Sequence, residues 1–302
     1  MKLIDHVIDC KSRADRAEIF VFGDCHIGKR NCDEQAIRKQ VKEVLRRSEL
    51  ANRYVRVLYG GDIVNAINPR GDKRFAYGDV ADWLVGEDAA ATRKNLTRLP
   101  AAEKARAVDI FSALSRFSIG AIEGNHEEAM KKYYSQDVHG EFCESMNIPD
   151  LTDEAIVRLR FKRKMGAGVT VLLYIRHGYG AGRSAGAEPS KIENMLKEWA
   201  NMDVCLTGHT HTFCSPVMLP VLYVPRGGKL PSRLRTRHRF GANWGCWLLS
   251  HLQGESSYES RACYPARPMM TVKVVVWPFW NTKHRGENVE EPKIELRSYP
   301  IL

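Results

Sequence analysis

Five short polar motifs, each containing glycine and most of them preceded by an apolar run, constrain the fold of this chain more than any other feature. In chain order they are GDCHIG, GGDIVNA, EGNHEE, RHGYG and GHTHT, and their polar residues fall between residues 23 and 211. The apolar runs have the length of buried strands. Because sites in α/β sheets gather at the carboxyl ends of strands, we expect the polar side chains of these motifs to meet.

The motifs carry side chains of the types that bind divalent metal ions. The candidate positions are Asp24, His26, Asp62, Asn125, His126, His177, His209 and His211. Histidine nitrogen combined with carboxylate and amide oxygen suits borderline-hard ions such as Mn, Fe or Zn. A single histidine is more often a hydrogen-bonded structural residue, but the ordered set of five motifs predicts a metal centre.

The hydrophobic periodicity predicts an α/β protein. Apolar runs predict strands at 18–24, 53–62, 117–125, 168–178 and 202–211, and the later segments 213–225, 244–251 and 270–277 also have strand character. Helical patterns cover 33–50, roughly 92–116 with a break or restart at Pro100, 138–147 and 189–200. The alternation in 156–164 is typical of an edge strand or a hairpin arm.

The 302 residues are expected to form a single domain, because the chain has no internal repeat and no linker rich in proline or serine. Residues 66–91, rich in glycine, aspartate and aromatic residues, are interpreted as an irregular insertion. The part from 212 to 302 is expected to be rich in β-structure. Together these features favour two packed mixed sheets with helices outside.

Composition and charge bear on the partners and the compartment. The net charge is +10 and the isoelectric point is about 9.2, which favours polyanions, nucleic acid first. The eight cysteines form no CxxC pair, the N-terminus is charged throughout, and no apolar run is long enough to span a bilayer. We therefore expect a cytoplasmic protein with reduced thiols and no membrane partner.

In these five blocks and their order, the chain resembles the calcineurin-like metallophosphoesterase superfamily. The resemblance implies a four-layer α/β/β/α sandwich and an enzyme that hydrolyses phosphate esters with two divalent metal ions, Mn first, with Fe, Zn, Ni or Co as alternatives. It places Asp24, His26 and His211 on one ion, Asn125, His177 and His209 on the other, and Asp62 between them. A hydroxide that bridges the ions would be the nucleophile.

The same resemblance makes His126 the acid that protonates the leaving oxygen. A carboxylate is expected to orient its ring, with Asp24 the first candidate and Glu127 the second. Asp24 would then be both a metal ligand and, together with His126, part of the catalytic pair. Cys25, between two ligands, is expected to point away from the metals.

The substrate is predicted to be nucleic acid, at RNA or DNA ends, or a nucleotide. Candidate substrate contacts are Lys29, Arg30, Arg233, Arg235 and Arg237, with Trp244 and Trp247 as possible stacking surfaces and the 66–91 insertion as a pocket wall. The second motif lacks the GDxVDRG continuation of Ser/Thr protein phosphatases. A phosphatase or phosphodiesterase acting on a small molecule or a protein remains an alternative, as does a non-catalytic metal-stabilised binding module. The oligomeric state is left open.

Overall fold

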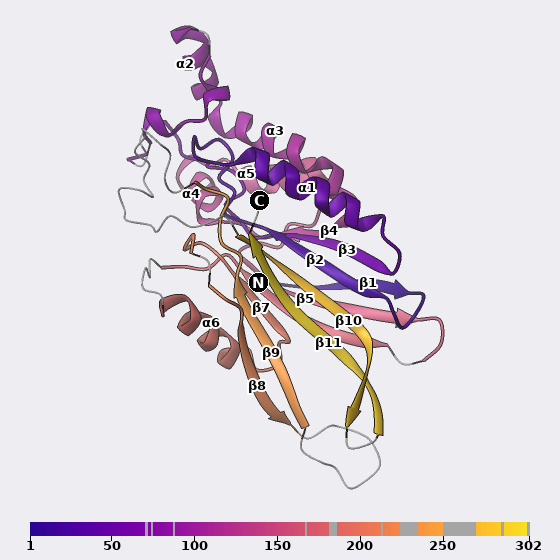
Figure 1. The fold of residues 1–302 in the computed structure, drawn as a ribbon. Helices are drawn as coiled ribbons and strands as arrows, with labels where there is room; N and C mark the ends of the chain where they lie inside the picture. The colour runs from indigo at the N-terminus through magenta and orange to yellow at the C-terminus, as the bar shows by residue number, and fades with distance from the viewer. Residues whose placement is uncertain are drawn as a thin grey trace.

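A computed structural model describes residues 1–69, 72–73, 75–86, 88–166, 168–180, 186–212, 214–223, 235–249, 270–284 and 287–300. Within these ranges the chain forms two mixed β-sheets that pack face to face, with α-helices on both outer faces (Figure 1). The predicted two-sheet α/β sandwich is therefore confirmed.

One sheet has six strands in the order β1-β5-β6-β7-β9-β8. Their bounds are β1 Lys2–Cys10, β5 Glu154–Arg163, β6 Val169–Arg176, β7 Val204–Thr207, β9 Arg235–Asn243 and β8 Val217–Tyr223. Strands β6, β7 and β9 run parallel to one another. Their carboxyl ends therefore lie at the same edge of the sheet.

The other sheet has five strands in the order β11-β10-β2-β3-β4. Their bounds are β11 Glu287–Pro300, β10 Met270–His284, β2 Arg16–Phe22, β3 Arg53–Tyr59 and β4 Ser118–Ala121. Strands β2, β3 and β4 are parallel, whereas β10 is antiparallel to both of its neighbours.

Apart from α2, which projects beyond the sheets, the helices lie on the two outer faces (Figure 1). Their bounds are α1 Glu34–Ser48, α2 Ala89–Thr97, α3 Leu99–Phe111, α4 Asn125–Tyr134, α5 Val138–Met146 and α6 Ala187–Glu198, with short 3₁₀ turns at Tyr77–Asp79, Asp82–Leu84 and Ser112–Phe117. Helices α1, α3, α4 and α5 cover the five-stranded sheet, and α6 covers the six-stranded sheet beside β8 and β9.

Strand β2 illustrates how the alternation of side chains builds the layers. Phe20 and Phe22 point into the core beneath α1 and α3, while Ile19 and Val21 point into the core between the sheets. All four side chains are buried. A strand buried on both faces needs apolar residues at every position, which is why this segment is a continuous apolar run.

Helix α1 forms where its sequence pattern predicts it. The side chain of Asp33 caps the first turn by accepting a hydrogen bond from the Ala36 N–H at 2.9 Å. Ile37, Val41 and Val44 form the buried stripe against the sheet. The predicted helices at 138–147 and 189–200 correspond to α5 and α6, and the restart at Pro100 corresponds to the first turn of α3.

Some local predictions differ from the structure. The segment 156–164 is a hairpin arm with β6, which confirms one of its two predicted alternatives; it is not an edge strand, because β1 pairs along its other side. Residues 244–249 form no strand, and the strand of this region is β9, which ends at Asn243. The sequence interpretation also missed β1, α4 and β11.

In the described part of the chain, no helix has both the length and the apolar character that a membrane crossing requires. The cysteines in those ranges are free thiols.

Candidate metal centre

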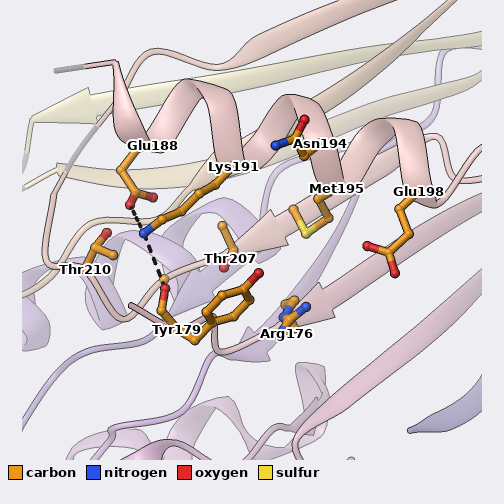
Figure 2. Close-up of a pocket in the computed structure, with 11 residues that line it drawn as sticks. Arg176, Tyr179, Glu188, Lys191, Asn194, Met195, Glu198, Thr207 and Thr210 are labelled. Atoms are coloured by element: carbon orange, nitrogen blue, oxygen red, sulfur yellow. Dashed lines mark hydrogen bonds and ion pairs between the residues drawn. The ribbon is translucent and has the colours of Figure 1, made fainter. Parts of the chain in front are cut away.

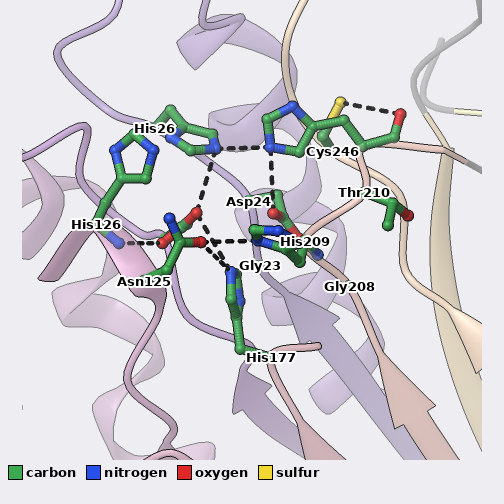
Figure 3. Close-up of polar contacts among 12 residues, drawn as sticks. Gly23, Asp24, His26, Asn125, His126, His177, Gly208, His209, Thr210 and Cys246 are labelled. Carbon is green, nitrogen blue, oxygen red and sulfur yellow. Dashed lines mark hydrogen bonds and ion pairs between the residues drawn. The ribbon is translucent and has the colours of Figure 1, made fainter. Parts of the chain in front are cut away.

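The five motifs meet where the carboxyl ends of strands from both sheets adjoin (Figure 3). Strands β2, β3 and β4 of one sheet end shortly before Asp24, Asp62 and Asn125. Strands β6 and β7 of the other sheet end shortly before His177 and His209. Residues far apart in sequence therefore share one site because parallel strands present their carboxyl ends at a common edge.

Asp62 lies between two groups of potential ligand atoms. One group is Asp24, His26, Asp62 and His211, the other is Asp62, His177 and His209, and within each group the ligand atoms lie within 4.8 Å of one another. Asp62 Oδ2 is 3.7 Å from His26 Nε2 and 3.3 Å from His177 Nε2. These buried groups of histidine and aspartate could hold metal ions.

Asn125 belongs to the group that contains His177. Its Oδ1 lies 2.8 Å from His209 Nδ1 and 3.1 Å from His177 Nε2. In the other group, His211 Nε2 lies 2.9 Å from the Nε2 atom of His26. The structure thus brings all seven predicted ligand positions together.

The buried polar atoms of the cluster fit a cation. Among the described residues, Asp24 Oδ1 and His26 Nδ1 are buried without a hydrogen-bond partner. A buried acceptor that lacks a donor costs about 1–3 kcal/mol, and more when it is charged. Asp24 Oδ1 is also only 3.3 Å from His211 Nε2. A divalent ion between carboxylate and imidazole would compensate this carboxylate oxygen.

The backbone at the cluster is strained. Positive φ angles occur at Asp24 (48°), His26 (48°), Asp62 (49°), His209 (73°) and His211 (50°). A non-glycine residue in the left-handed region is uncommon, and such positions cost about 1–3 kcal/mol each. Strain at five of the seven ligand positions shows that the surrounding structure holds these loops in place, which is typical of a functional site.

Electrostatics favour neutral imidazole at two of the histidines and an ionised carboxylate at Asp62. Burial, reinforced by His126, lowers the pKa of His26, and burial with His177 lowers that of His209. Burial alone would raise the pKa of Asp62, but His177 and His126 bring it well below its ordinary value. Burial would likewise lower the pKa of His177, but Asp62 raises it to about 10. A metal ion bound by His177 would take the place of this proton, because histidine binds metals as the neutral imidazole.

Glu127 holds the loop that carries Asp62. Its carboxylate accepts hydrogen bonds from the N–H groups of Asp62 (3.0 Å), Ile63 (2.8 Å) and Val64 (3.2 Å). Glu103 accepts from the N–H of Ala66 at 2.7 Å on the same loop. The sequence interpretation missed this support, although an acidic residue two positions after a ligand was a signal for it.

His126 has a different ring partner from the one predicted. Its Nδ1 hydrogen-bonds the carbonyl oxygen of Asn65, so the carboxylates of Asp24 and Glu127 are both wrong as the orienting group. Because a carbonyl oxygen only accepts, Nδ1 carries the proton. The ring packs edge-on against His26 with 4.7 Å between centroids, and the backbone N–H of His126 donates to Asp62 Oδ1 at 3.0 Å. His126 therefore lies beside the ligands.

Lys29 and Arg30 lie between the first motif and the insertion. Lys29 is buried, its positive charge contributes to the lowered pKa of His26, and its backbone bridges to Val80. The guanidinium of Arg30 is 3.4 Å from Asp82. The described part of the 66–91 insertion thus packs against the loop of the first motif.

The structure describes the side chain of only one of the predicted substrate contacts Arg233, Arg235 and Arg237. Arg233 lies outside the described residues, and of Arg235 only the backbone, in β9, is described. The exposed Arg237 pairs with Asp203, at the start of β7. Asn243 lies six residues after Arg237 on the extended strand, about 20 Å away at the usual rise. Arg237 therefore lies toward the opposite end of β9 from the candidate metal centre, and its contact with substrate stays a prediction.

The two tryptophans are not stacking surfaces for substrate, because both are only 2% exposed. Trp247 stacks on Phe22 in the core beneath the helices, with 5.6 Å between ring centroids. Trp244 donates a hydrogen bond from Nε1 to Asp24 Oδ2 at 2.6 Å. Cys25 is fully buried in the core, which agrees with its predicted orientation away from the metals.

A small pocket of about 110 Å³ lies beneath α6 and beside the loops of His177 and His209 (Figure 2). Buried Glu188 on α6 accepts a hydrogen bond from Asn243 Nδ2 at 3.0 Å, and Asn243 Nδ2 also donates to Thr210 Oγ1 at 3.1 Å. This chain of contacts ties α6 to the loop that carries the last two ligands.

A second cleft of about 360 Å³ borders the ligands Asn125 and His177 directly. Its acidic lining is Glu123, Glu128, Asp153 and Glu154, and Arg176 is the basic residue that lines it. The side chains on this side of the candidate metal centre are therefore mainly acidic. They disfavour a polyanion that runs along the cleft away from the metal ions.

No protein-family model matches this chain, and no curated protein matches it.

Proposed function

We propose that this chain is a divalent-metal-dependent phosphoesterase. The observation that carries the proposal is the convergence of six further candidate ligand positions on Asp62, whose carboxylate lies between two groups of imidazoles. The resemblance of the five motifs to the calcineurin-like metallophosphoesterases supports the same reaction class. The metals are expected to be two in number, Mn first, with Fe, Zn, Ni or Co as alternatives.

Asp24, His26 and His211 would hold one ion, Asn125, His177 and His209 the other, and Asp62 would contact both. When bound, such ions supply charge stabilisation for phosphate oxygens and lower the pKa of water. His126 would give a proton to the leaving oxygen from Nε2, while its Nδ1–H stays on the carbonyl of Asn65. Glu127 would hold Asp62 in place through the backbone of its loop.

We propose nucleic acid ends or nucleotides as the first substrate class. The net charge of +10 supports this choice, because basic surfaces attract polyanions. The acidic cleft beside Asn125 and His177 favours a second candidate, a small phosphate ester that reaches the metals without crossing that side. Lys29, whose charge acts on the neighbouring His26, is proposed as a basic contact for either substrate.

The reaction class can be tested with two model esters. Metal-free protein is reconstituted with Mn²⁺ and assayed on bis-p-nitrophenyl phosphate and on p-nitrophenyl phosphate. We expect metal-dependent turnover, and the preferred ester separates diesterase from monoesterase activity. Absence of turnover with every divalent ion tested would leave only the non-catalytic, metal-stabilised binding module.

The substrate class needs a separate panel. Oligonucleotides that end in 5′-phosphate, 3′-phosphate or 2′,3′-cyclic phosphate are compared, with mapping of the products and of the salt dependence. For a nucleic acid substrate we expect a rate that falls steeply with salt. Turnover of small esters without processing of any oligonucleotide would support the small-molecule candidate instead.

A further inference from the structure

The indole of Trp244 fills a space between three motif loops. Trp244 follows β9 directly and is buried, and its N–H in the main chain donates to the Thr207 carbonyl at 3.0 Å. A methyl group on Gly23, Gly60 or Gly208 would overlap the indole ring. Glycine at these three positions, one in each of the first, second and fifth motifs, therefore lets the ring approach the backbone beneath the metal centre.

The indole also fixes the carboxylate of Asp24. Asp24 Oδ2 accepts from Trp244 Nε1 at 2.6 Å and from the His209 N–H at 3.0 Å. The other oxygen, Oδ1, faces His211 Nε2 at 3.3 Å and has no hydrogen-bond partner among the described residues. One oxygen is thus occupied by two donors, while the other is directed toward the ligand cluster.

We propose that Trp244 is a positioning residue that makes Asp24 bind metal through Oδ1 alone. The inference rests on the proposed metal centre. It goes beyond that proposal because a residue outside the five motifs, Trp244, would determine which oxygen of Asp24 binds the ion. Hydrogen-bond partners that orient ligands typically change metal affinity by about 10- to 100-fold when they are replaced. Without the indole N–H, Oδ2 keeps a single donor, the His209 N–H, and the χ2 angle of the carboxylate is less restricted.

The alternative role for Trp244 is packing alone. Trp244 belongs to the core between the sheets, so loss of its ring would also disturb apolar contacts. Trp244→Phe separates the two roles, because it keeps a buried aromatic ring and removes the N–H donor. Trp247→Phe is the matched control, since Trp247 is equally buried and belongs to the other core, where it stacks on Phe22.

The test measures Co²⁺ binding to metal-free wild type, W244F and W247F by calorimetry and by the visible absorption spectrum of the bound ion. We expect W244F to bind one equivalent about 10- to 100-fold more weakly, with a changed spectrum. We expect W247F to match wild type in both measurements. Wild-type affinity and spectrum in W244F would overturn the positioning role, whereas failure of the wild-type protein itself to bind Co²⁺ would contradict the metal centre.

A measurement on the wild-type chain covers the case in which W244F does not fold. The indole N–H resonances are recorded with and without Zn²⁺, which is diamagnetic, and those of Trp244 and Trp247 are assigned by triple-resonance NMR of the wild-type chain. A hydrogen bond to a metal-bound carboxylate weakens when the ion withdraws charge from the oxygens. We expect the Trp244 resonance to shift on Zn²⁺ binding and that of Trp247 to stay, and an unmoved Trp244 signal in zinc-loaded protein would contradict the proposal.

Discussion

The side chain and the backbone of His126 make separate contacts. The backbone N–H donates to Asp62 Oδ1 at 3.0 Å, whereas the ring is held by the Asn65 carbonyl and packs against His26. A substitution of the side chain therefore keeps the contact that supports the shared ligand. The proton-donor role and the structural role of this residue can be separated by experiment.

We predict that His126→Ala retains its metals but loses about 10²- to 10⁴-fold in turnover on alkyl phosphate esters. The loss should be much smaller with p-nitrophenol as leaving group, because that group departs without a proton. Metal content and the rates on both types of ester are measured on the same preparation. Equal losses on both ester types would contradict the acid role, as would lost metal with normal turnover in the remaining holoenzyme.

His139 provides a prediction for the pH dependence of stability. Burial alone would lower its pKa, but Asp150, whose Oδ1 lies 3.0 Å from Nε2, and Cys143 raise it to about 10. A pKa raised on folding means that the protonated form stabilises the fold. This stabilisation is complete below the ordinary pKa of 6.5 and is lost as the pH rises toward about 10.

We therefore expect the difference in unfolding free energy between wild type and His139→Gln to shrink by about 1–2 kcal/mol between pH 6 and pH 10, after allowance for the solvent around the partly exposed Asp150. Urea unfolding at a series of pH values measures the difference. A difference that stays constant over this range would show that His139 is neutral in the folded protein.

At the scale of elements, the buried carboxylate of Glu18 on β2 lies among cations from four segments: β2, α1, β3 and β10. This group lies at the end of β2 that is remote from Asp24. Its carboxylate pairs with Arg47 of α1 and with Arg16 of its own strand at 3.0 Å, and Lys273 of β10 lies 3.4 Å away. Arg53, at the start of β3, is 3.8 Å away. Burial would raise the pKa of Glu18, but Arg47 and the other cations lower it to about 2.

Glu18→Gln should lower the unfolding free energy by about 3–5 kcal/mol, because it leaves buried cations without their partner. Glu43→Gln on α1 is the matched control: this partly exposed carboxylate pairs with Arg46 and Arg47, and we expect a loss of about 0–1 kcal/mol. Both variants should bind Mn²⁺ with wild-type affinity, since Glu18 lies six residues before Asp24 on an extended strand. Weakened metal binding in Glu18→Gln would show that the site depends on this end of the strand.

The strands and helices differ in how far the sequence could predict them. Strands β2, β3, β6 and β7 were recognisable because continuous apolar runs end in polar motifs, and α1 because its apolar positions repeat with a helical period. Strand β1 was missed because most of its side chains lack burial and its partner, β5, lies about 150 residues away. Helix α4 was missed because it begins at Asn125, inside a motif interpreted only as ligands.

At the scale of the whole molecule, the meeting of the candidate ligand positions could be predicted, whereas the contacts that support them could not. Seven positions could be named because each lies within a short motif, and parallel strand ends bring them together. The supports are contacts between distant segments: Trp244 with Asp24, Glu127 with the Asp62 loop, and Asn65 with His126. Trp244 and Arg237 became candidates for substrate contacts on residue type alone. A local sequence pattern shows neither the burial of Trp244 nor the position of Arg237 along β9.

The central claim is that this cluster hydrolyses a phosphate ester only when it holds divalent metal. Its most direct test is a titration of metal-free protein with Mn²⁺ during hydrolysis of bis-p-nitrophenyl phosphate and p-nitrophenyl phosphate, with Asp62→Asn in parallel. We predict that the wild-type rate rises from the background and saturates near two equivalents of bound Mn²⁺, and that Asp62→Asn stays near the background. Mn²⁺ binding without hydrolysis of either ester, or hydrolysis that persists in metal-free protein, would contradict the account.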